Sequence, residues 1–315
     1  MDVARAPWSS ASFLVYLGGL TVFFSGLAFL AIEGGSRGDG GLVLWAAIVL
    51  AVFSACAEGF RRTGHRVAAG LFAFNAVWAL VVFVGALEEW FGWLANTDGP
   101  FDGFHPSLLL LELVALVASL WALSRFRFPL LAGAAAAAGW FFVTDVVSNG
   151  GGWTAIVSIA IGLVLLGIAS GIDGGPSRPY GFWVHAVAGL TIGGGLLWFF
   201  HKGDFRWILI GIAALAYIAL GTRLVRSSWV VLGAWGLLQM TTHFADKWAG
   251  IGSSDFFPLS LILFPLYGFG FGDSGATRHF WAAPVSYAVL GLVFVAIGLW
   301  IAKRRRDVIP AAELL

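Results

Sequence analysis

The chain has 315 residues, of which 59% are hydrophobic and 11% are charged, and its formal net charge is +1. So few polar side chains cannot cover a water-soluble globule of this length, which excludes a soluble protein and makes the lipid bilayer the expected surroundings of most of the surface. A net charge this small provides no basic face for nucleic acid, so no nucleic-acid partner is expected.

Apolar runs of membrane-spanning length follow one another along the chain. A hydrocarbon core of ~30 Å needs about 20 apolar residues per helix, and short breaks rich in Gly, Pro, Asp and Arg separate the runs. The first run is too long for a signal-peptide core, so we interpret it as a retained helix. The predicted helices cover 11–32, 41–60, 66–88, 104–123, 128–148, 151–171, 179–200, 205–223, 228–246 and 280–302. The sequence therefore predicts an all-α, polytopic transmembrane bundle of about ten helices.

The segment 256–272 (FFPLSLILFPLYGFGFG) does not fit this scheme. It is apolar enough to enter the membrane, but Pro258, Pro265 and three late glycines interrupt it. Irregular backbone at membrane depth survives only where protein or water shields it. We expect a broken outer segment that is re-entrant or interfacial, and both a pathway lining and an apolar loop over the helix ends agree with its composition.

The distribution of Lys and Arg predicts the orientation. With the N-terminus inside, the cytoplasmic segments hold 13 of the 18 basic residues and the outer loops hold five. Short loops retain positive charge on the cytoplasmic side of a membrane. We therefore expect a multi-pass protein of the cell membrane with both termini in the cytoplasm.

Weak self-similarity suggests an internal repeat. The matched positions lie in helices of the same orientation, six helices apart. They pair Gly19 with Gly189, Trp45 with Trp207, Gly59 with Gly221, Arg61 with Arg223, Gly70 with Gly233, and Arg125 with Lys303. The pattern predicts a four-helix half in 1–127, a two-helix insert in 128–171 and a second four-helix half in 172–315, with the halves arranged as parallel repeats. A five-plus-five inverted repeat would also suit ten helices.

The order of the first three predicted helices carries a family resemblance. A Gly-rich helix (LGGLTVFFSGLAFLAIEGG) is followed by a helix ending EGFRRTGHR and by a third beginning VAAGLFAF. Over about the first 90 residues this order resembles the predicted membrane domains of bacterial polytopic proteins of unknown function. The resemblance implies a membrane domain and carries no activity or catalytic residue to this chain.

Glu112 is the foremost candidate site residue, because it lies within the fourth predicted helix among apolar neighbours. Ionisable groups are costly inside a membrane and frequently mark ion or substrate pathways. The functional interpretation is a carboxylate that binds a proton or cation. The structural alternative is a carboxylic acid that hydrogen-bonds a neighbouring helix.

Four further polar residues in predicted helices complete the candidate pathway. His185 could relay protons near neutral pH, although a lone histidine near a helix end is more often packed or hydrogen-bonded. Uncharged hydrogen-bonding groups in membrane helices usually hold helices together. These groups are Asn75, Gln239 and Thr242.

The predicted outer face gathers carboxylates and imidazoles that could hold zinc or another divalent ion if the helix ends converge. No spacing among them matches a known metal signature, and solvated loop charge is the alternative interpretation. The candidates are Glu88, Glu89, Asp145, His201, His243 and Asp246. The residue pattern identifies no cofactor.

Small residues gather on three predicted helices, at 133–139 (GAAAAAG), Gly167-x-x-x-Gly171 and Gly189-x-x-x-Gly193. Small side chains allow helix backbones to approach closely, either within the molecule or against a partner helix or a second copy of the chain.

These features favour a small secondary transporter or permease with a proton- or cation-binding carboxylate in the fourth helix. The first alternative is a non-transporting scaffold or subunit of a larger membrane complex, and the second is a metal-dependent membrane enzyme with its site on the outer face. An enzyme is the less expected class, and we assign no catalytic residue.

Overall fold

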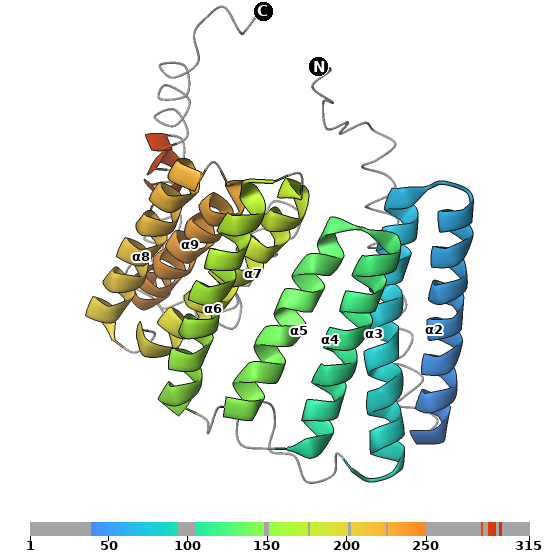
Figure 1. Cartoon of the computed structure of the whole chain (residues 1–315). Helices are drawn as coiled ribbons and strands as arrows, with labels where there is room; N and C mark the ends of the chain where they lie inside the picture. The colour runs from blue at the N-terminus through green and yellow to red at the C-terminus, as the bar shows by residue number, and fades with distance from the viewer. Residues whose placement is uncertain are drawn as a thin grey trace, which may run out of the picture. The chain divides into compact units, whose positions relative to one another are not determined.

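A computed structural model describes residues 39–93, 105–147, 151–175, 177–200, 203–224, 226–249, 285, 289–293 and 296–297 (Figure 1). The chain divides into two compact units, Met1–Gly195 and Leu196–Leu315. The described residues form helices and short connections and contain no strand, which confirms the all-α prediction.

The first unit contains α2 (Asp39–Arg62), α3 (Arg66–Trp90), α4 (Pro106–Phe126), α5 (Pro129–Val147), α6 (Gly151–Asp173) and most of α7 (Arg178–Phe200). Figure 1 shows α2 to α6 side by side, with successive helices running in opposite directions. The second unit contains the end of α7, followed by α8 (Asp204–Leu224) and α9 (Ser227–Ala249).

Eight of the predicted helices are present within a few residues of their expected bounds, from 41–60 (α2) to 228–246 (α9). In the described part of the chain, seven helices, α2 to α8, are long and apolar enough to cross a membrane. The predicted helix 11–32, most of 280–302 and the broken segment 256–272 lie outside the described residues. The count of ten helices and the internal repeat therefore stay predictions, as do the boundaries of the three predicted parts.

The surface and the interior have the composition of a membrane protein. On α6, the large apolar side chains of Leu163, Val164 and Ile168 are exposed, whereas Ala155 and Ala169 are buried. Without a bilayer such a surface would be an aggregation hazard, and small buried residues are typical of helix contacts in membranes. The chain is therefore an integral, multi-pass membrane protein whose apolar helices contact lipid.

The α3–α4–α5 group is held together by close apolar packing around the connection between α4 and α5. Leu71, Ala122, Phe128 and Leu131 belong to one buried apolar cluster. A Cβ at Gly70 would overlap the Phe128 ring, so a glycine is required where α3 passes this connection. The connection itself is only two residues long, Arg127 and Phe128.

Close packing also joins α5, α6 and α7 within the first unit. A Cβ at Gly133 would lie 3.0 Å from the Cβ of Trp183, so the first glycine of the predicted small-residue stretch 133–139 meets α7. Gly162 on α6 meets Thr191 and Ile192 on α7 in the same way. Gly167 and Gly171, by contrast, have no atom of the described residues within 4 Å of an added Cβ.

In the second unit, α8 and α9 form a closely packed pair. A Cβ at Gly233 would lie 2.5 Å from the Ala214 carbonyl oxygen, and one at Gly221 would lie 2.7 Å from the Val230 side chain. Ala214, Leu237 and Leu290 are buried in a common apolar cluster.

All Lys and Arg residues in the described part of the first unit lie at one end of its helices. They are Arg61, Arg62, Arg66, Arg125, Arg127 and Arg178. Each lies in the terminal turn of a helix or in the connection beyond it. We refer to this as the basic end and to the other as the acidic end, where α3 ends with Glu88 and Glu89.

Candidate functional site

A pair of carboxyl groups lies inside the first unit, contributed by Glu112 on α4 and Asp145 on α5. Glu112 is half-buried, Asp145 is 1% exposed, and their carboxyl groups lie close enough to interact directly. Two ionised carboxylates at such close range repel each other, and a hydrogen bond between them would need a proton on one group, because neither oxygen of an ionised carboxylate can donate. Glu112, six residues after Pro106, lies ~9 Å from the start of α4 at 1.5 Å per residue.

The packing of the two helices explains why these residues meet. Leu116 on α4 lies opposite Gly139 on α5, where an added Cβ would be 3.8 Å from its Cδ1. The helices are antiparallel, so moving one turn toward the start of α4 corresponds to moving toward the end of α5. That step leads from Leu116 to Glu112 and from Gly139 toward Asp145.

A third acidic residue, Glu88, is buried near the same end. Glu88 is only 2% exposed, and neither of its carboxyl oxygens has a hydrogen-bond partner among the described residues. Gly85 on α3 faces Leu111 on α4, with 3.6 Å between an added Cβ and Leu111 Cδ2. Glu88 is therefore about one helical turn nearer the acidic end than Glu112, a rise of ~5 Å.

Unused hydrogen-bonding capacity is concentrated around this acidic end. Besides Glu88, the Oε2 atom of Glu112 and the hydroxyl of Thr144 are buried without a hydrogen-bond partner in the described part of the chain. Buried polar groups are normally satisfied, so each exception indicates water, an ion or a functional role. We define Glu88, Glu112, Thr144 and Asp145 as the carboxyl site.

His185, the second predicted pathway residue, does not join the carboxyl site. It is fully buried near the start of α7, and its Nε2 lies 2.9 Å from Asp173 Oδ2 at the end of α6. Both residues lie toward the basic end, whereas Glu112 lies toward the acidic end. The structure therefore places His185 in a hydrogen bond with Asp173, which agrees with the packed, hydrogen-bonded alternative, and its role in a pathway stays a prediction.

The three uncharged pathway candidates lie in helices, as predicted. Asn75 is 4% exposed on α3, and Gln239 and Thr242 are partly buried on α9. The Thr242 hydroxyl donates to the Leu238 carbonyl oxygen of its own helix at 2.9 Å. Such a bond to the carbonyl oxygen four residues earlier is common for threonine in helices and does not indicate a pathway. The pathway role of these three residues stays a prediction.

The predicted metal ligands are distributed over both units. His243 Nε2 lies 3.4 Å from Asp204 Oδ1, Lys247 also pairs with Asp204, and the His243 ring stacks on Trp207. Glu89 is exposed, His201 is outside the described residues, and the structure does not describe the Asp246 side chain. Over the described ranges, no three His, Cys, Asp or Glu side chains converge to hold a metal ion. The outer-face metal site stays a prediction.

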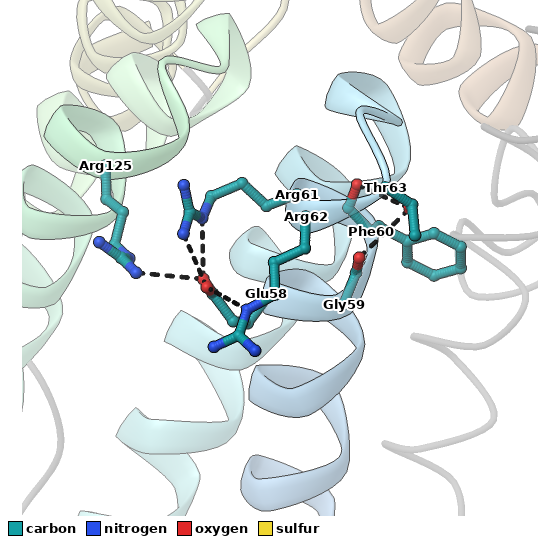
Figure 2. Close-up of polar contacts among 7 residues, drawn as sticks. All are labelled: Glu58, Gly59, Phe60, Arg61, Arg62, Thr63 and Arg125. Atoms are coloured by element: carbon teal, nitrogen blue, oxygen red, sulfur yellow. Dashed lines mark hydrogen bonds and ion pairs between the residues drawn. The ribbon is translucent and has the colours of Figure 1, made fainter.

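One charged cluster was not among the predicted site residues. At the basic end, Glu58 accepts hydrogen bonds from Arg61 at 2.7 and 2.8 Å, from Arg62 at 3.0 Å and from Arg125 at 3.2 Å (Figure 2). Arg61 and Arg62 belong to the last turn of α2, and Arg125 comes from the last turn of α4. The signal in the sequence was Glu58 itself, an acidic residue among the arginines that predicted the cytoplasmic side.

Comparison of the chain with protein families, with characterised proteins and with solved structures gives no match.

Proposed function

We propose that this membrane protein is a small secondary transporter or permease that exchanges a proton or a small cation at the carboxyl site. The observation that supports the proposal is the close approach of the Glu112 and Asp145 carboxyl groups, one of them fully buried, between α4 and α5. Two acidic groups lie next to each other inside a membrane helix pair, where ionisable residues are costly and are therefore candidates for a function.

The chemistry of such a pair suits exchange. With its shared proton the pair carries one negative charge, and loss of that proton places two negative charges side by side, which repel each other strongly at low dielectric constant. The pair then takes up either a new proton or a cation. Glu88, one turn nearer the acidic end, provides a second acceptor between the pair and that end.

The test is flux through reconstituted vesicles that contain a pH-sensitive dye and carry an imposed membrane potential. Wild-type protein should take up protons, and sodium-gradient experiments report cation exchange. Glu112→Gln retains a group that can hydrogen-bond to Asp145 but cannot release a proton, so the flux should fall at least tenfold while folding is preserved. Asp145→Asn should have the same effect.

Glu89→Gln is the matched control, because Glu89 is exposed at the same end. Its flux should equal that of the wild type. If Glu112→Gln also retains full flux and only Glu112→Ala damages the protein, the carboxyl pair is a structural contact and the transporter proposal is wrong.

A specific observation favours a second candidate function, that of a non-transporting subunit or scaffold. Gly167 and Gly171 are exposed on α6, and nothing in the described residues packs against them. Such a surface suits a partner helix or a second copy of the chain. Gly167→Leu with Gly171→Leu should then reduce the oligomer mass measured by light scattering, and wild-type vesicles should show no flux above empty ones.

A further inference from the structure

An apolar cavity of about 390 Å³ extends between α2, α3 and α4 in the first unit. Its lining includes Leu50 and Ala57 from α2, Val77 and Leu80 from α3, and Ala118 and Trp121 from α4. The volume lies within the ~300–1,000 Å³ range of small-molecule sites. The cavity is therefore large enough to bind part of an organic molecule and apolar enough to prefer a hydrocarbon group.

The same cavity reaches the charged cluster at the basic end, because Glu58, Arg62 and Arg125 also line it. One carboxylate and three guanidinium groups give this cluster a net charge of +2 (Figure 2). The Arg62 side chain is 76% exposed and that of Arg125 is 42% exposed. Each guanidinium has five N–H donors, and Glu58 uses only one from each of these two residues, so donors remain for an external anion.

The position of the cluster matches the level of lipid head groups. Arg62 is the last residue of α2, where the apolar helix ends. Trp121, on α4, is 62% exposed beside the cavity, and indole rings prefer the membrane interface. Leu50 lies eight residues before Glu58, so the lined region extends ~12 Å along α2 from the charges toward the hydrocarbon core.

We propose that this cavity binds an anionic phospholipid, with its phosphate on Arg62 and Arg125 and one acyl chain against the apolar lining. Charge complementarity distinguishes this occupant from the alternatives. A neutral lipid would leave the excess positive charge without a counterion, and a soluble anion would leave the apolar part unfilled. Basic pockets between transmembrane helices on the cytoplasmic side bind anionic head groups by the same chemistry.

The direct test is native mass spectrometry of the purified full-length chain in detergent, titrated with phosphatidylglycerol or with phosphatidylcholine. Wild-type protein should retain one phosphatidylglycerol molecule with at least tenfold preference over phosphatidylcholine. The double variant Arg62→Gln/Arg125→Gln should lose at least tenfold in phosphatidylglycerol affinity and keep its phosphatidylcholine binding. Ala118→Phe fills the apolar part and should weaken binding of the anionic lipid; Ala76→Phe serves if that variant does not fold.

The matched control is Arg66→Gln/Arg223→Gln, which removes two exposed positive charges from helix ends without touching the cavity lining. It should bind phosphatidylglycerol as the wild type does.

An equal loss of phosphatidylglycerol affinity in this control variant would indicate nonspecific binding to surface charge. Displacement of the lipid by millimolar inorganic phosphate would indicate a soluble-anion site. An absence of bound lipid, together with cysteine cross-linking of Leu80 to the segment 11–32, would indicate that the chain's own N-terminal segment fills the cavity. Each of these results would overturn the proposal.

Discussion

At the scale of single residues, Gly181 determines how closely the Asp173 carboxyl group approaches α7. A Cβ at this position would overlap Asp173 Oδ1, which belongs to the same carboxylate that bonds His185. His185 itself is completely buried, so the geometry of its bond with Asp173 depends on this space. A glycine is therefore needed near the start of an otherwise ordinary helix.

We expect Gly181→Ala to displace Asp173 and break its bond with His185. Loss of a buried hydrogen bond costs about 1–3 kcal/mol, which exceeds the gain of up to ~1 kcal/mol from the higher helix propensity of alanine. The melting temperature in detergent should fall. Gly194→Ala is the control on the same helix, because nothing lies within 4 Å of an added Cβ there, and it should leave the melting temperature unchanged or raise it.

The contacts of His185 also show what a single residue's sequence context can and cannot predict. The predicted helix bounds place His185 several residues inside the helix, so the sequence identifies it as a polar group within the membrane. Its partner cannot be predicted, since that depends on the rotation of α6 and α7 about their axes. The same reason explains why the sequence indicates Glu112 as a candidate but not its pairing with Asp145.

At the scale of elements, the contact between α3 and the α4–α5 connection depends on Gly70. We expect Gly70→Ala to force the Phe128 ring out of its buried position, since overpacking a filled core costs about 1–3 kcal/mol. The substitution should lower the midpoint of unfolding in detergent. This decrease should be larger than the one caused by alanine at a position with open space around it.

Gly167→Ala provides that open position, because Gly167 is exposed on α6 and an added Cβ there would meet no atom of the described residues within 4 Å. Equal destabilisation by both changes would contradict the packing argument and would indicate that Gly167 is covered in the native protein.

Helix bounds are the most predictable feature of the elements. The bilayer fixes the length of an apolar run, and charged or turn-forming residues mark its ends, so α2 to α9 agree with the sequence within a few residues. The cluster around Glu58 is less predictable. In the sequence its arginines indicate only orientation, and the packing of both α2 and α4 against α3 is needed to show that Arg125 reaches the same carboxylate as Arg61.

At the scale of the whole molecule, the distribution of charge predicts the orientation in the membrane. In single-cysteine variants that lack Cys56, Thr63→Cys lies in the turn at the basic end and Glu89→Cys lies at the acidic end. A membrane-impermeant thiol reagent should label Glu89→Cys in intact cells and Thr63→Cys only after permeabilisation. The reverse pattern would mean that the basic end faces outward and that the orientation assigned from Lys and Arg is wrong.

The predicted internal repeat receives no direct support from the glycines that suggested it. Gly70 packs against the α4–α5 connection, whereas its counterpart Gly233 packs against α8. A Cβ at Gly221 would be in close contact with Val230, whereas a Cβ at its counterpart Gly59 would meet no atom of the described residues within 4 Å. Sequence matches in Gly-rich membrane helices arise from a limited alphabet as easily as from a shared structure, so the repeat stays a prediction.

The two-residue connection between α4 and α5 has a consequence for membrane insertion during synthesis. So short a link commits the two helices to enter the bilayer together as a hairpin, with Arg127 at its bend and the carboxyl site toward its open ends. An aspartate at the centre of an inserting helix costs about 2.5–3.5 kcal/mol, and acidic residues nearer the helix ends, such as Glu112 and Asp145, cost less. In a hairpin Glu112 and Asp145 enter the membrane next to each other, so each carboxyl group provides a hydrogen-bonding partner that the other would lack if the two helices were inserted separately.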